Sequence, residues 1–212
     1  MTNQSVIEMP ARPRPVVRDP DAKRRHILEA ARRLLTERGF QDIVLDEVAA
    51  KAGVAKGTLF LHFKNKDDLF SAVFSEMVDA LGLELSALAK TGLKGKEMLV
   101  AAAKVILNHF DRNRDFMGQI GAGRLPGCCG ERSRGRLMDK FRANHAALRE
   151  ILALASCDGA RSVRDPDFAV AAFFGLCRSA AVRDLVHRRE GALEREAERV
   201  VAFFLDGSGI AL

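Results

Sequence analysis

A short segment near the start of the chain combines the residue types that bind nucleic acid: residues 56–62, KGTLFLH. Lys56 carries a compact positive charge that can reach phosphates or the acceptors of guanine. Thr58 and His62 can each donate a hydrogen bond to a phosphate oxygen, His62 even when it is neutral. Gly57 lets the backbone approach a groove wall closely, and Leu61 suits a thymine methyl group. The segment therefore has the chemistry of a DNA contact.

The residues around this segment predict three helices that would position it. An Asp19-Pro20 start, apolar residues at helical spacing between 27 and 35, and Gly39 as a left-handed cap define the first helix. The next runs from Leu45 to Ala52, is broken at Gly53, and is followed at once by a helix over 56–63. Two short helices joined by a tight glycine-containing turn predict a helix-turn-helix, with Leu59 and Phe63 on its buried side.

The positive charge of the chain is concentrated in the same region. The net charge is +6 over 212 residues, and residues 1–66 hold thirteen Lys and Arg against eight Asp and Glu. The rest of the chain is nearly neutral. This asymmetry is typical of a phosphate-binding head on a near-neutral body. Residues 1–18 are rich in Pro and Arg, which predicts a flexible basic arm.

The remaining sequence predicts a larger helical body and no strand, so the expected fold class is all-α. Helices are expected over 66–89, 96–110, 137–155, 167–187 and 193–205 from the spacing of their apolar residues. The fourth of these is apolar nearly all round in its first half and must be covered on both sides. Five glycines and a proline predict a loop over 121–135. No apolar run approaches the roughly 20 residues that cross a bilayer, and the N-terminus lacks the pattern of a secretory signal, so a cytoplasmic location is expected.

Residues 24–70 resemble the TetR family of repressors. The parts that match are ILEAA, LL-x-x-x-GF, EVA-x-x-AGV, GTLF-x-HF and K-x-x-L, in that order and with the family's gaps. This covers about a quarter of the chain. The resemblance implies a helix-turn-helix domain over 19–66 whose third helix lies in the major groove, after the basic arm of 1–18. It also implies a ligand-binding and dimerisation domain over 67–212.

The resemblance assigns the DNA contacts residue by residue. The positions expected to face DNA are Lys56, Gly57, Thr58, Phe60, Leu61 and His62, with Lys66 on a phosphate. Three positions depart from the family pattern. Phe60 stands where relatives usually have Tyr, and Ala55 and Val44 stand where a capping Ser or Thr is usual, which should cost about 1 kcal/mol for each lost cap. Fewer phosphate contacts than usual are expected.

The resemblance also implies a homodimer on a palindromic DNA operator, released by a small-molecule inducer. We expect the two final long helices to pair with those of a second copy through Ala169, Ala172, Phe173, Leu176, Ala180, Val200, Phe203 and Phe204. The inducer pocket is expected within residues 96–187. Its candidate lining residues are Met98, Phe110, Met117, Met138, Phe141, His109 and His145, and an apolar or aromatic ligand is the default.

Two alternatives remain open at the level of sequence. Cys128 and Cys129 in the glycine-rich segment would suit a redox- or metal-responsive regulator of the same fold. Adjacent cysteines lie too close for an unstrained disulfide, however, and no spacing requires a metal. A constitutive DNA-binding protein without a ligand is the other alternative. No nucleophile elbow, phosphate loop or HExxH motif occurs, so neither an enzyme nor a cofactor is expected.

Overall fold

The computed structural model describes residues 20–38, 40–114, 131–156, 165–186 and 192–208, and this part of the chain is helical without any strand. The all-α prediction is therefore confirmed. The elements are α1 (Pro20–Glu37), a 3-10 turn η1 (Phe40–Asp42), α2 (Leu45–Lys51), α3 (Lys56–His62), α4 (Lys66–Leu88), α5 (Gly95–Arg112), α7 (Glu131–Ala155), α8 (Pro166–Val186), a 3-10 turn η2 (Leu193–Glu196) and α9 (Ala197–Ser208).

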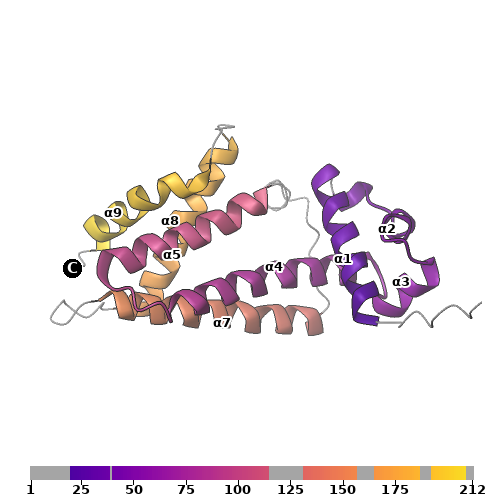
Figure 1. Cartoon of the computed structure of the whole chain (residues 1–212), viewed down its shortest axis with the longest axis horizontal. Coiled ribbons are helices and arrows are strands. Elements are labelled where there is room, and N and C mark those ends of the chain that lie inside the picture. Colours follow the sequence, from indigo (N-terminus) through magenta and orange to yellow (C-terminus); the bar gives the residue numbers. More distant parts are fainter. Residues whose placement is uncertain (1–19, 39, 115–130, 157–164, 187–191, 209–212) are drawn as a thin grey trace, which may run out of the picture.

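The first three helices pack around a small core of their own, at one end of the molecule in Figure 1. Leu59 and Phe63 are buried in it, as their spacing predicts. The first half of α4 completes this core with Leu69, Phe70 and Val73. We call α1–α3 the head. Ion pairs tie its surface together, such as the pair between Arg38, just after α1, and Glu47 of α2, with 3.0 Å between Nη1 and Oε1.

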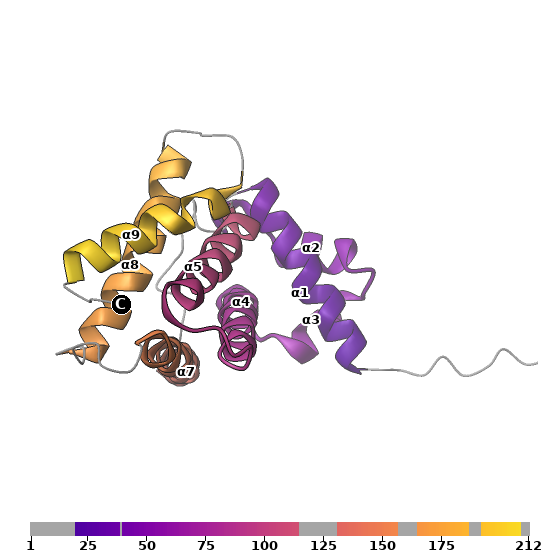
Figure 2. The same cartoon turned by 60° about the vertical axis from the view of Figure 1, so that its left-hand side comes forward.

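The second half of α4 belongs to a separate and larger core. There it packs with α5, α7, α8, η2 and α9, which we call the body. Figure 1 shows α4 running from the head into the body, and Figure 2 shows it lying between them when viewed nearly end-on. Side chains of α4 therefore belong to both cores and connect the head to the body.

Within the body, α4 and α7 run side by side in the same direction, and α5 runs in the opposite direction (Figure 1). The contacts record this register. Phe74 packs on Phe141 with ring centroids 6.0 Å apart, and one turn later the Asn144 side-chain nitrogen donates to the Val78 carbonyl oxygen at 2.8 Å. Gly82 makes room for this Asn144, since an added Cβ would lie 2.2 Å from its Oδ1.

The helix α8 is largely covered within the chain, as its apolar sequence requires. Its buried side faces α5, α7 and α9, and Phe173 meets Phe204 of α9 edge to face at 5.1 Å. Its outer side still exposes Phe168, Val182 and Val186. Among the helices that the structure describes, none combines the length and the apolar character that crossing a membrane requires.

Two sequence predictions of local structure were wrong in part. Residues 131–135, expected in the glycine-rich loop, form the first turns of α7. Gly135 is the only breaker among them, and its cost of about 1 kcal/mol in a helix is offset by the packing of the following turns on α4. The final segment, expected as one helix from Leu193, begins instead with the 3-10 turn η2, and α9 starts at Ala197. The rest of the predicted loop, 121–130, lies outside the described residues.

Candidate nucleic-acid interface and ligand cavity

The third helix presents most of the predicted DNA-contacting residues to solvent. Leu61 is 86% exposed and Phe60 is 44% exposed, both large fractions for apolar side chains. Lys56 and Gly57 are exposed, whereas Thr58 and His62 are half-buried. Such exposure of large apolar groups is unfavourable in water and is typical of a surface that binds a partner.

The Lys56 side chain has a partner of the opposite charge within the head. Its Nζ lies 2.8 Å from Asp46 of α2, and both side chains are more than half exposed. An exposed pair of this kind contributes little free energy, so a phosphate can compete for the ammonium group. The short helices α2 and α3 have Val44 and Ala55 as their N-cap residues and no side-chain cap hydrogen bond, as predicted from these residue types.

Lys66 has partners within the head as well. Its Nζ donates to the Gln41 carbonyl oxygen at 3.1 Å and lies 4.4 Å from the centre of the Phe40 ring. Burial is the main cause that lowers the pKa of this amine. The side chain therefore holds the turn η1 against the start of α4. Its predicted phosphate contact stays a prediction.

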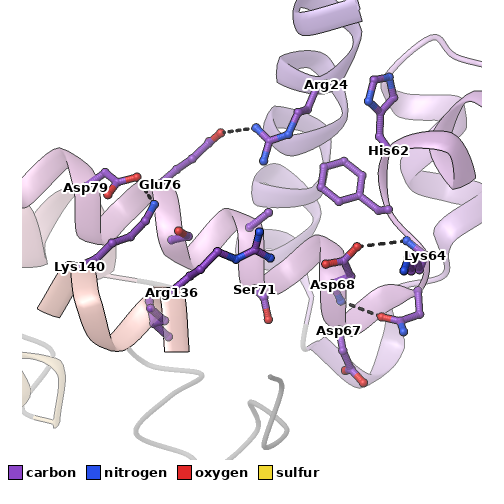
Figure 3. Close-up of a pocket in the computed structure, with 15 residues that line it drawn as sticks. Arg24, His62, Lys64, Asp67, Asp68, Ser71, Glu76, Asp79, Arg136 and Lys140 are labelled. Atoms are coloured by element: carbon purple, nitrogen blue, oxygen red, sulfur yellow. Dashed lines mark hydrogen bonds and ion pairs between the residues drawn. The ribbon is translucent and has the colours of Figure 1, made fainter. Parts of the chain in front are cut away.

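A broad polar groove lies between the head and α7, and two ion pairs brace α4 across it (Figure 3). On one side Arg24 of α1 meets Glu76 of α4 at 3.3 Å, and on the other Lys140 of α7 pairs with Asp79 of α4. The groove has a volume of about 1120 Å³ and its lining alternates basic and acidic groups. Among the described residues that lining offers no consistent charge or apolar surface, so it does not favour one class of ligand.

A second cavity, of about 450 Å³, lies inside the body between α4, α5, α7 and α8. Its size is that of a pocket for a small organic ligand. Most of its surface is apolar, and the polar side chains among its described lining come from α5, α7 and α8. The lining residues are Phe74, Met77, Val78, Leu81, Leu85, His109, Phe110, Phe141, Asn144, His145, Leu148, Val170, Ala171, Phe174, Arg178 and Val182.

Some of the residues predicted from sequence for the pocket line this cavity and others do not. Phe110, Phe141, His109 and His145 do. Met98 is fully buried in the core near the start of α5, and it does not line the cavity. Met138 is exposed on α7 and is likewise not part of the lining. Met117 lies outside the described residues.

Sequence reasoning missed the contributions of α4 and of Arg178 to the cavity. The half of α4 that faces the cavity reads in sequence as ordinary core. A signal for Arg178 exists, because it is the only charged residue of α8 between Asp167 and Arg183. A single cation within an otherwise apolar helix indicates either an exposed position or a binding role.

His109 is the most buried polar group of the cavity wall, with 7% of the residue exposed. Burial lowers its pKa to about 4, against an ordinary value near 6.5. The carboxylate of Glu84 opposes this shift, and the cations of Arg112 and Arg32 add to it. The imidazole is therefore neutral at pH 7 and offers one donor and one acceptor.

Most of the residues predicted for the dimer interface are buried in the chain's own core. This holds for Ala169, Phe173, Ala180, Val200 and Phe204. Ala172 and Leu176 are half-buried, and Phe203 is 66% exposed. The spacing identified an apolar helix pair but not which of its faces points outward, because α8 is apolar on both.

Of the cysteines, the structure describes Cys177 alone, and it lies in the body core with no exposure. Burial raises the pKa of its thiol to about 12, so at neutral pH it is an unreactive thiol. The hypothesis of a redox- or metal-responsive regulator depends on Cys128 and Cys129, which lie outside the described residues.

Comparison with known proteins identifies the head. Residues 27–73 match the family model of bacterial regulatory proteins of the tetR family. The N-terminal region of the chain therefore matches the TetR family. The transcriptional regulator AcrR of Shigella flexneri is 43% identical over 68 residues, which are 32% of this chain and 32% of AcrR. The fatty acid metabolism regulator protein of Bacillus subtilis is 34% identical over 84 residues, 40% of this chain and 42% of that protein. The match thus spans less than half the length of either relative.

Solved structures of TetR-type regulators share the fold over most of the chain. FadR from Bacillus halodurans superposes with a TM-score of 0.72 at 19% identity, over 87% of this chain and 95% of its own. FadR from Bacillus subtilis, solved in complex with stearoyl-CoA, superposes with a TM-score of 0.71 at 19% identity, over 86% and 98%. At these identities the likeness establishes the fold alone.

Proposed function

We propose that this TetR-family protein is a repressor that binds a palindromic DNA operator as a homodimer and is released by a small molecule bound in the body. The observation that carries the proposal is the exposure of Phe60 and Leu61 beside Lys56 on α3, in a domain of a DNA-binding family. Residues 19–66 would bind DNA, residues 67–212 would bind the ligand and the second copy, and the basic arm of 1–18 would add phosphate contacts.

The contacts assigned to α3 divide into two kinds. Lys56, Thr58 and His62 would hold phosphates or base edges through charge and hydrogen bonds, while Phe60 and Leu61 would exclude water and contact thymine methyl groups. With Phe60 in place of a phenol, and with two uncapped helices, we expect the head to rely mainly on its cations. We therefore expect a steep loss of operator affinity with rising salt.

The homodimer is supported by the apolar side chains that α8 and α9 leave exposed. Phe168 is 71% exposed, and Val186 and Phe203, which lie outside the cavity lining, are exposed as well. These helices lie at the end of the molecule away from the head (Figure 2). Pairing of two copies through this surface would cover the apolar groups and place two heads on half-sites about 34 Å apart.

Release by a ligand is supported by the place of the cavity along α4. Phe74 and Leu81 of α4 face the cavity, and the first half of the same helix belongs to the core of the head. A ligand that prefers one position of α4 shifts the spacing of the two heads by its differential affinity for that position. The neighbour from Bacillus subtilis carries stearoyl-CoA, which makes an acyl compound a reasonable first ligand to test.

The test is selection of bound sequences from a random pool of duplexes, followed by gel-shift measurement on the selected site. The full chain should select an approximate palindrome and keep it against random competitor DNA. The double variant Lys56→Ala, His62→Ala should lose at least about tenfold in affinity with an unchanged circular dichroism spectrum, whereas Lys90→Ala, an exposed lysine beyond α4, should not.

Three results would count against the proposal. A double variant that binds as tightly as the parent would remove α3 from the interface. Loss of site preference in random competitor DNA would identify a constitutive DNA-binding protein instead. A monomer by light scattering at micromolar concentration would overturn the dimer.

A further inference from the structure

The cavity in the body has one charged side chain in its described lining, and this side chain is a cation. Arg178 lies on α8 and is exposed at the rim of the cavity. Its guanidinium makes no hydrogen bond or ion pair with the residues that the structure describes. No Asp or Glu belongs to that lining. A cationic ligand would therefore meet an uncompensated like charge, while an anionic one would meet a free guanidinium.

Deeper in the cavity a second polar group stands without a partner. The imidazole of His109, which is more than nine-tenths buried, contacts the Phe110 ring but makes no hydrogen bond in the described part of the chain. Its ring nitrogens are not among the fully buried unpaired atoms of the described residues, so its donor and its acceptor stay accessible from the cavity and open to a ligand. By contrast, the amide nitrogen of Asn144 is already held by the Val78 carbonyl.

Most of the remaining described lining is apolar, so the larger part of a ligand must be apolar as well. Aromatic rings from three helices, Phe74, Phe110 and Phe174, face the cavity together with Leu81 and Leu148. An apolar chain or ring system buried among them gains the usual free energy of removal from water. Arg178 is the only Lys or Arg in the described lining and lies at the rim, so the polar end of the ligand would stay near solvent and keep part of its hydration.

We propose that the cavity binds a carboxylic acid that carries an apolar chain or ring system. The apolar part would lie among the phenylalanines, and the carboxylate would pair with Arg178 at the rim. The planar guanidinium can donate two parallel hydrogen bonds to a carboxylate. The single Arg among the described lining residues matches the single charge of a carboxylate. The inference rests on the proposed function, because it names the ligand class of the same site.

The test compares three probes with one apolar chain and different ends: decanoate, 1-decanol and decylamine. Binding to the full chain is measured by titration calorimetry below the concentrations at which the probes form micelles. Decanoate should bind most tightly and decylamine least. Arg178→Gln should weaken decanoate by about tenfold to a hundredfold and leave decanol unchanged, while Arg178→Lys should keep part of the preference. The control is Arg142→Gln, since Arg142 is exposed on α7, pairs with Asp139 and lies outside the cavity.

A second pair of variants tests whether the probes enter the cavity. Ala171 is exposed at the rim of the cavity, so Ala171→Trp should weaken the binding of both decanoate and decanol. The control is Ala143→Trp, which should not change their binding because Ala143 is exposed on α7 outside the lining. Decanoate binding that survives Ala171→Trp or Arg178→Gln, or a decylamine affinity equal to that of decanoate, would overturn the inference. Operator binding is measured on the same preparations: its absence defeats the proposed function alone, because the probes are tested without DNA.

Discussion

Arg32 of the head donates a hydrogen bond of 2.6 Å from its Nη2 to the side-chain oxygen of Asn113, the residue that ends α5 in the body. The nitrogen of the same Asn113 side chain donates to the carbonyl oxygen of His109 at 2.7 Å. His109 lines the ligand cavity. A hydrogen-bonded route of three residues therefore joins the cavity wall to the first helix of the head, in addition to α4.

This route predicts a measurable coupling between Arg32 and Asn113. In a double-mutant cycle of Arg32→Ala and Asn113→Ala, the free energy of unfolding in urea should show a coupling of about 1 kcal/mol, because the bond exists only when both side chains are present. The bond from Asn113 to His109 is lost in both variants that lack Asn113 and cancels in the cycle.

Arg33 is the matched control for this cycle. It neighbours Arg32 on α1 but pairs with Glu29 of the same helix. Arg33→Ala combined with Asn113→Ala should be additive within the error of the measurement. An equal coupling at Arg33, or none at Arg32, would mean that the contact between head and body does not contribute to stability in solution.

The effect of Gly82→Ala on the free energy of unfolding should depend on the residue at position 144. In the middle of α4, Gly82→Ala would normally stabilise the helix by about 1 kcal/mol. Here the new Cβ would lie 2.2 Å from Asn144 Oδ1, so Asn144 must move and give up its bond to Val78. We expect no gain, or a loss, in the parent chain, and a gain of about 1 kcal/mol in the Asn144→Ala background.

The control for Gly82 is Gly135, a helical glycine of α7 with no atom within 4 Å of an added Cβ. Gly135→Ala should stabilise by about 1 kcal/mol whether residue 144 is Asn or Ala. Thermal or urea unfolding of the six chains decides the matter. A Gly82→Ala effect that is the same in both backgrounds contradicts the packing of Asn144 against α4.

The missing cap of α3 predicts a stabilising substitution in the head. Ala55 has the extended backbone of an N-cap residue, with φ −67° and ψ 147°, but no side-chain acceptor. Ala55→Ser should gain about 0.5–1 kcal/mol by accepting a hydrogen bond from a free N–H of the first turn. Ala50→Ser, exposed within α2, should gain nothing. Equal stabilities of the two serine variants in urea unfolding would show that α3 does not depend on this position.

The sequence predicted the head in detail because its local signals agree with its packing. The start at Pro20, the break at Gly53 and the buried Leu59 and Phe63 all lie where spacing and turn chemistry place them. The DNA-facing residues are neighbours in one short helix. Their relative positions therefore follow from helical geometry alone, and their contact with DNA remains a prediction.

The cavity was harder to predict, because its wall comes from four helices far apart in the sequence. His109 and Phe110 were within reach as polar and aromatic residues of an amphipathic helix. Met98 lies on the same helix, and the sequence alone could not exclude it from the lining, because it does not show which turn of α5 faces the cavity. For α8, apolar on both sides, periodicity gives no inner face at all.

The buried His109 predicts a dependence of stability on pH. Its pKa in the folded chain is about 4, below the ordinary 6.5, so the unfolded chain binds the proton first as the pH falls. The free energy of unfolding should therefore decrease between about pH 6.5 and 4, by up to on the order of 3 kcal/mol from this group. His109→Gln removes the titration, and its stability should fall less than that of the parent when urea unfolding is compared at pH 7, 5.5 and 4.5. His26→Gln, exposed on α1, should follow the parent. If the two variants have the same pH dependence, His109 is not held neutral by burial in the cavity wall.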